Sequence, residues 1–105
     1  MNQLQLIATL SAREVLRYTP AGLPIVTGTL LHQSQQIEAN IPRLIEFEIA
    51  VIAAGEISGK FSQAELGNMF QFTGFLARKS RNSKSIVFHI TNFDTHSTDH
   101  IHTGA

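Results

Sequence analysis

The sequence predicts an all-β fold, a small barrel of five strands with one short helix between the third and the fourth strand. Three observations lead to this prediction. Apolar side chains recur with a period of two in several separate stretches, one stretch between Gly55 and Gly67 changes to a helical period, and turn residues separate the strands. A chain of 105 residues with a hydrophobic fraction of 43% has room for one domain around one core.

The first strand is predicted over residues 4–10, where four apolar side chains share one face: Leu4, Leu6, Ala8 and Leu10. The pattern continues less regularly over residues 11–17. A reversal of the chain follows, because Pro20 presets a turn and Gly22 adopts a positive φ at no steric cost.

The second and third strands are predicted on either side of a polar loop. The second strand covers residues 25–32, and Gly28 at its centre indicates a bulge or a sharp bend. Residues 33–42 are polar and predict a loop. The third strand covers residues 43–54 and has an apolar face made of Ile45, Phe47, Ile49 and Val51.

One short helix is predicted between Gly55 and Gly67. Three apolar side chains in this segment have the spacing of one helical face: Ile57, Phe61 and Ala64. Ser62 and Glu65 have the spacing of a capping box, and Gly67 suits a helix end.

Residues 69–93 predict a long β-hairpin with aromatic strands and a basic tip over residues 78–84. In its first strand, Phe70, Phe72 and Leu76 are expected to face inward, whereas Gln71, Thr73 and Phe75 are expected to face outward. Phe75 is thus the main exposed aromatic candidate. The other phenylalanines assigned to the core are Phe47, Phe61, Phe70, Phe72 and Phe88.

Three strands, one helix and two more strands are the element order of the OB fold, a five-stranded Greek-key barrel with a helix between its third and fourth strands. Other small barrels and sandwiches share parts of this order. Residues 1–94 are expected to form the OB-fold domain. Residues 95–105 are polar and His-rich without apolar rhythm, which predicts a flexible tail.

The formal net charge is zero, but the charges are segregated along the chain. The hairpin tip contains four basic residues and no acidic one: Arg78, Lys79, Arg81 and Lys84. The acidic residues concentrate elsewhere, among them Glu38, Glu46, Glu48, Glu56 and Glu65. A local positive patch on a neutral body is a binding surface for a polyanion, although a charged loop can also simply be solvated.

Other classes of function find little support in the sequence. There is no cysteine, so disulfides, thiolate metal sites and a cysteine nucleophile are excluded. No catalytic motif is present, and His96, His100 and His102 with Asp94 and Asp99 are too loosely spaced to predict a metal site. No enzyme, cofactor or small-molecule substrate is expected. Without a signal peptide or an apolar run long enough for a membrane span, a cytoplasmic location is expected and no membrane partner.

Two segments resemble bacterial single-stranded DNA-binding proteins. The alternating first strand leads to Arg17-Tyr18-Thr19-Pro20-x-Gly22, which is similar to the N-terminal signature of that family. Gly74-Phe75-Leu76-Ala77 resembles the matching segment of the fourth strand. Unlike the main single-stranded DNA-binding proteins, this chain has no tryptophan, and it lacks their long tail with an acidic tip.

These departures make the chain more similar to the related family of primosomal replication protein N (PriB). The segments that fit that family are Gly22-Leu23-Pro24, Leu31-His32-Gln33-Ser34 and Phe47-Glu48-Ile49. The resemblance implies a homodimer without catalysis. It also implies binding of single-stranded DNA without sequence preference and contacts with the restart helicase PriA and other primosome proteins.

The resemblance also points to binding residues. Basic side chains near the first turn and in the loop between the last two strands correspond here to Arg17, Arg78, Lys79, Arg81 and Lys84. Tyr18, beside Arg17, is a candidate for base stacking or for packing under its own turn, and Phe75 for base contact or an interface. Glu46 occupies the position of a third-strand aromatic that stacks on a base in some members. The alternative function is a protein-interaction adaptor with weak or lost DNA binding, which the zero net charge and the absence of tryptophan favour.

Overall fold

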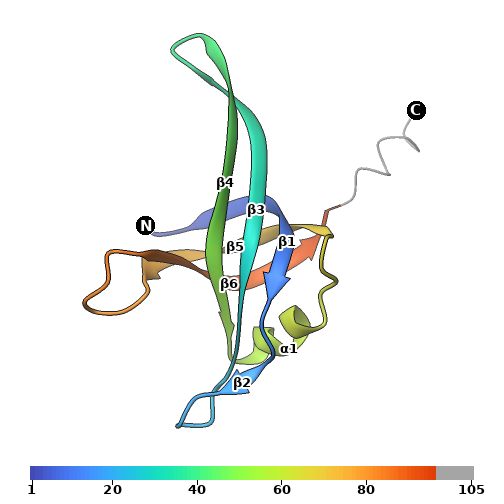
Figure 1. Ribbon diagram of the computed structural model, residues 1–105, viewed down its shortest axis with the longest axis vertical. Coiled ribbons are helices and arrows are strands. Elements are labelled where there is room, and N and C mark those ends of the chain that lie inside the picture. Colours follow the sequence, from blue (N-terminus) through green and yellow to red (C-terminus); the bar gives the residue numbers. More distant parts are fainter. Residues whose placement is uncertain (97–105) are drawn as a thin grey trace.

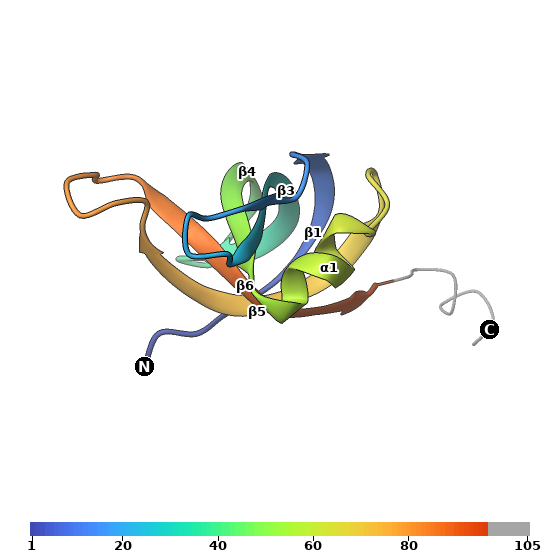
Figure 2. The same cartoon turned by 90° about the horizontal axis from the view of Figure 1, so that it is seen from below.

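The computed structural model describes residues 1–96 and shows a closed β-barrel (Figures 1 and 2). Its elements are β1 (Leu4–Arg13), the short β2 (Arg17–Tyr18), β3 (Pro24–Glu38), β4 (Ile41–Ala54), α1 (Glu56–Ser62), β5 (Met69–Arg78) and β6 (Ile86–Thr95). Residues 97–105 lie outside the described part, so the expected tail over residues 95–105 stays a prediction except that Thr95 ends β6.

The strand order of the barrel is β1-β5-β6-β4-β3, and a second pairing of β1 with β3 closes it. The first half of β1 pairs with β5, and its second half pairs with β3. All of these pairs are antiparallel except β4 with β6, which is parallel. This topology, with α1 between β4 and β5, is that of the OB fold. The predicted all-β fold is therefore confirmed, as is the hairpin of β5 and β6.

Two glycines allow close contacts between strands at irregularities of the barrel. A Cβ atom on Gly28 would lie 2.6 Å from the Ala12 carbonyl oxygen, beside the register shift of β1. A Cβ atom on Gly74 would overlap the His89 carbonyl oxygen, at the register shift between β5 and β6. At Gly28, β3 pairs with both β1 and β4. The register shift is in β1, and β3 pairs with β4 without interruption, so the bulge predicted at Gly28 does not lie in β3.

Aromatic side chains form much of the core. Phe61 of α1 packs edge to face against Phe93, with ring centroids 5.8 Å apart, and Phe70 does so at 5.3 Å. Phe72 and Phe88 are fully buried, which confirms their inward assignment. Phe93 belongs to the same buried cluster, although it was not among the predicted core residues.

The predicted helix forms, but its start and end differ from those predicted. It begins after Gly55, which has a φ of 78° and makes no side-chain cap. Ser62 is the last helical residue, and its hydroxyl donates to the Gly59 carbonyl at 2.8 Å. The predicted capping box of Ser62 and Glu65 was therefore wrong, because sequence spacing alone did not distinguish the start of the helix from its end.

The polar segment over residues 33–42, predicted as a loop, is instead the end of a long β-hairpin. β3 and β4 pair continuously from Ile25 opposite Ala54 to Glu38 opposite Ile41. The turn consists of Ala39 and Asn40, whose φ angles of 54° and 64° are those of a two-residue type I′ turn. The outer part of this hairpin projects from the barrel (Figure 1). Residues 32–48, beyond the last pairing of β3 with β1 at Leu31, are called the hairpin arm below.

No helix within residues 1–96 has the length and apolar character needed to cross a membrane.

Candidate nucleic-acid interface

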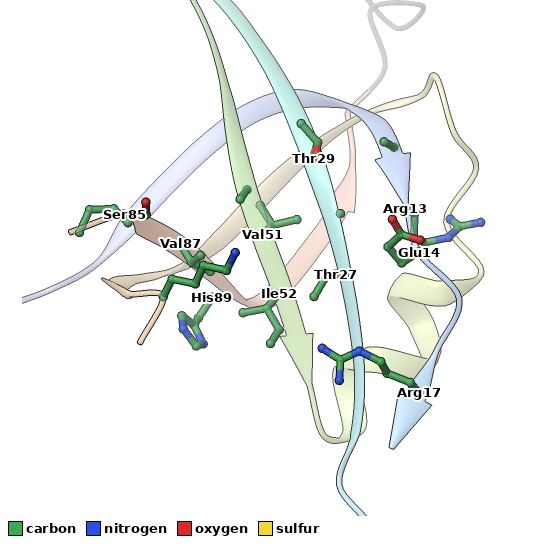
Figure 3. Close-up of a pocket in the computed structure, with 15 residues that line it drawn as sticks. Arg13, Glu14, Arg17, Thr27, Thr29, Val51, Ile52, Ser85, Val87 and His89 are labelled. Carbon is green, nitrogen blue, oxygen red and sulfur yellow. The ribbon is translucent and has the colours of Figure 1, made fainter. Parts of the chain in front are cut away.

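A cavity of about 690 Å³ opens on the outer face of the barrel, where β3 and β4 pass between the first turn and the β5–β6 loop. Its floor is formed by small and β-branched residues: Thr27, Gly28, Thr29, Ala50, Val51 and Ile52. Charged side chains stand around this floor. Arg17 approaches from β2, whereas Ser85, Val87 and His89 lie on the opposite side (Figure 3). Lys79 also lines the cavity.

The cavity thus brings together two predicted site residues that are far apart in the sequence. Arg17 belongs to β2, which pairs with the start of β3, and Lys79 follows the last residue of β5. Both side chains are exposed. Because two cations on opposite walls raise the local positive potential, the cavity suits a ligand with several negative charges.

The first turn holds Arg17 and Tyr18 in place through its backbone. Thr19 N–H donates to the Leu23 carbonyl at 2.9 Å, and the Thr19 hydroxyl accepts from Leu23 N–H at 3.1 Å. Gly22 has a φ of 88°, as its turn position requires. Tyr18 is 67% exposed, so it is not packed under its own turn, and it does not line the cavity.

The β5–β6 loop presents the basic tip beside the cavity. Lys79 N–H donates to the Ser85 carbonyl at 2.9 Å, which closes the loop at its base. Arg78, Lys79 and Lys84 are exposed, and Arg81 belongs to the same loop. The only ion pair within residues 1–96 joins Arg43 and Glu38, so none of these four cations is neutralised by a described carboxylate.

An aromatic pair lies at the edge of the cavity that Ser85 and Val87 form. Phe75 and His89 are paired across β5 and β6, and their rings stack with centroids 4.8 Å apart and an angle of 8° between the planes. Phe75 is 39% exposed, which confirms that it faces outward. His89 was not predicted as a site residue, although the alternation of β6 places it on the same outer face as Val87.

Two charged residues from the end of β1 complete the cavity wall. Arg13 donates hydrogen bonds to the carbonyls of Ala64 and Phe61, so its guanidinium is used at the end of α1. Glu14 also lines the cavity and opposes an anionic ligand there. Neither residue was predicted from the sequence.

Phe47 was wrongly assigned to the core. It is 39% exposed and lies against His32, its partner across the arm, with ring centroids 5.0 Å apart. Its side of β4 faces the core nearer the barrel, where Val51 and Ala53 are buried. Phe47, however, lies opposite His32, beyond the last residue of β3 that pairs with β1. Most of the loosely spaced metal candidates, including His100, His102 and Asp99, lie outside the described residues.

Comparisons with known proteins agree with this architecture. Residues 2–92 match a family model described as another single-strand binding protein family. The chain is 42% identical over 89 residues to the replication restart protein PriB of Nitrosomonas europaea, covering 85% of this chain and 82% of that protein. It is 34% identical over 91 residues to PriB of Neisseria gonorrhoeae, covering 87% and 90% of the two chains.

Solved structures show the same relationship. The structure of PriB from Ralstonia solanacearum superposes with a TM-score of 0.85 at 43% identity, covering 92% of this chain and 99% of that chain. The single-stranded DNA binding protein from Thermus aquaticus superposes with a TM-score of 0.74 at 25% identity, covering 93% of this chain and 51% of that chain. The fold and the family match place the chain among the OB-fold proteins of the single-strand binding class. Within that class, the chain belongs to the family of the replication restart protein PriB.

Proposed function

We propose that this protein binds single-stranded DNA in the cavity between the first turn and the β5–β6 loop, as an accessory protein of the replication restart primosome. The observation that carries the proposal is the position of Arg17 and Lys79 on opposite walls of one cavity, with Phe75 and His89 stacked at its edge. Membership of the PriB family supports the same function.

The proposed binding has no preference for a base sequence. Cations that contact phosphates and aromatic faces that stack on bases tolerate every sequence, because every nucleotide has a phosphate and every base a π-face. Arg78, Arg81 and Lys84 extend the positive surface beyond the cavity. Residues 1–94 constitute the binding domain, and the chain itself performs no catalysis.

A salt-dependent titration tests this function. The affinity for a fluorescently labelled oligothymidylate, measured by anisotropy, should fall with salt at a log–log slope of about −0.7 per phosphate contact. Four or five contacts give a slope of about −3. Absence of binding at low salt, or binding that does not depend on salt, contradicts the proposal.

The restart role requires partners, and we propose the restart helicase PriA and other primosome proteins, which this chain bridges to DNA in the cytoplasm. Purified PriA from the same source, with a single-stranded DNA of matched length, provides the test. A ternary complex in analytical gel filtration is expected. If DNA and PriA instead displace each other from this protein, bridging is contradicted.

A homodimer is also proposed, through the open edge of β1. Over Leu4–Ala8, β1 pairs with β5 on one edge, and its pairing with β3 on the other edge begins only at Thr9. Ile7 is 39% exposed there. An unpaired strand edge is a natural two-fold contact. Equilibrium sedimentation at micromolar concentration should give twice the mass of 11.6 kDa, and a monomer refutes the dimer.

The competing function is a protein-interaction adaptor that has weak DNA binding or none. The Glu14 carboxylate in the cavity favours it. Alanine at Arg78, Lys79, Arg81 and Lys84 together separates the two functions. Loss of oligothymidylate binding with PriA binding intact supports the DNA-binding function. Loss of PriA binding with DNA binding intact supports the adaptor.

A further inference from the structure

The hairpin arm is a two-stranded ribbon with unpaired backbone edges. β6 pairs with β4 only from Val51 to Ala53, so within residues 1–96 the second edge of β4 over residues 41–50 has no strand partner. Isolated two-stranded ribbons are marginally stable, and an open edge is a template for an additional strand. The arm therefore has a backbone site to which an extended segment can add.

The side chains of β4 in the arm follow a pattern along one face. Pro42, Leu44, Glu46 and Glu48 lie two residues apart and so share a face. Leu44 is 86% exposed, and Ile37, which is paired with Pro42, is 67% exposed. This face is apolar near the turn and acidic near the barrel.

The charge of the arm is opposite to that of the basic tip. It contains three carboxylates, Glu38, Glu46 and Glu48, and one cation, Arg43. Arg43 pairs with Glu38, and no described cation forms an ion pair with the other two carboxylates. Glu46 accepts a hydrogen bond from the Gln33 side chain, which leaves its charge in place. None of the arm residues lines the cavity, and their charge disfavours a nucleic acid.

We propose that the open edge of β4 in the arm binds an extended segment of a protein partner as a third strand. In an antiparallel addition, the segment carries Lys or Arg opposite Glu46 and Glu48, and apolar side chains opposite Leu44 and Pro42. Its sequence pattern is therefore basic-x-basic-x-apolar-x-apolar. Main-chain hydrogen bonds supply affinity in this mode, and the alternate side chains supply specificity. The surface is separate from the cavity, so the proposal does not depend on DNA binding.

A displayed library of random 12-residue peptides, panned against the full chain, tests this proposal. Selected peptides should show the basic and apolar alternation. Glu46→Lys with Glu48→Lys should weaken their binding at least about tenfold, because like charges then face each other. Peptides in which the basic positions are changed to Glu should bind that double variant and restore the affinity. On binding, amide exchange should slow in β4 over residues 41–49.

Several outcomes overturn the proposal. These are the absence of any enriched peptide, an acidic consensus, or selected peptides that bind the double variant as well as the unchanged protein. Weaker binding of oligothymidylate by Leu44→Ser assigns the face to DNA instead, and a change of sedimentation mass in that variant assigns it to a second copy of the chain. Because Leu44, Glu46 and Glu48 are exposed, the variants should fold. Binding of the charge-swapped peptides to the double variant verifies that this variant is folded.

Discussion

The rings of Phe75 and His89 stack at a centroid distance of 4.8 Å across β5 and β6, at the edge of the cavity that holds Arg17 and Lys79. His89, which lies on the side of the cavity, packs against one face of the Phe75 ring, and Phe75 remains 39% exposed. The pair is a flat surface next to a positively charged cavity. A base can stack on such a surface while the flanking phosphates reach the cations.

Phe75→Ala should weaken binding of oligothymidylate by about 1–3 kcal/mol, the usual contribution of one stacked base. The salt slope should not change, because no phosphate contact is lost. Anisotropy titrations at three salt concentrations measure both quantities. Met69→Ala is the control, since Met69 is 40% exposed on the same strand but lies at its start, away from the β5–β6 loop. Equal losses in the two variants argue against stacking at Phe75.

Arg17→Gln and Lys79→Gln should each make the salt slope less negative by about 0.7, because each removes one phosphate contact. The double variant should show about twice this change, since the two side chains come from separate elements. Arg43→Gln serves as the control, as Arg43 is an exposed cation already paired with Glu38. A slope that stays constant in both single variants would place the phosphates elsewhere.

Glu14→Gln should tighten DNA binding about twofold to fivefold at low salt, because it removes a negative charge from the cavity wall. The gain should shrink as salt rises. Glu56→Gln, in the first turn of α1, is the matched control and should change little. If Glu14→Gln binds DNA no better than the unchanged protein, the strand does not pass through this cavity.

Much of the fold could be predicted from the sequence, because the barrel strands bury one face and so alternate in polarity. Ala8 and Leu10 in β1, and Phe70 and Phe72 in β5, are buried as their pattern indicates. The polar end of the hairpin arm, residues 33–42, could not be predicted in this way, although residues 43–48 were predicted as a strand. Its strands carry polar side chains on both faces of a ribbon, as at Gln35 and Gln36, so polarity has no period there.

The site was predicted in part. Two predicted residues, Arg17 and Lys79, line the cavity. The others lie outside its lining: Tyr18, Phe75, Arg78, Arg81 and Lys84. His89 and Glu14 could be recognised as site residues only from the structure, which places them beside these cations. Their positions depend on contacts between strands that are distant in the sequence. Phe47 was misassigned because the alternation of β4 does not reveal where the strand leaves the core.

The turn of the arm gives a prediction about local stability. Ala39 has a φ of 54°, a conformation that costs a non-glycine residue roughly 1–2 kcal/mol. Replacing Ala39 by Asn and Asn40 by Gly introduces the preferred type I′ pair. Amide exchange of residues 33–46 should slow about fivefold or more, while exchange in β5 stays constant. Faster exchange in the arm would mean that the turn is not type I′.

Gly74 gives the sharpest prediction about the barrel itself. Any Cβ atom there would overlap the His89 carbonyl oxygen and lie 2.9 Å from the Phe88 ring, so β5 and β6 would have to separate. Gly74→Ala should therefore lower the free energy of unfolding by at least about 2–3 kcal/mol in urea denaturation. It should also weaken DNA binding, because His89 and Phe75 would move apart.

Gly59→Ala is the matched control for this effect. Gly59 lies inside α1, and outside the helix's own backbone no atom comes within 4 Å of the position that a Cβ atom would take, so alanine fits and favours the helix. It should raise the free energy of unfolding by about 0.5–1 kcal/mol. Opposite signs for the same chemical change would establish that the β5–β6 contact at Gly74, and not the loss of a glycine as such, determines the stability of the barrel. Equal effects of the two substitutions would contradict that close approach.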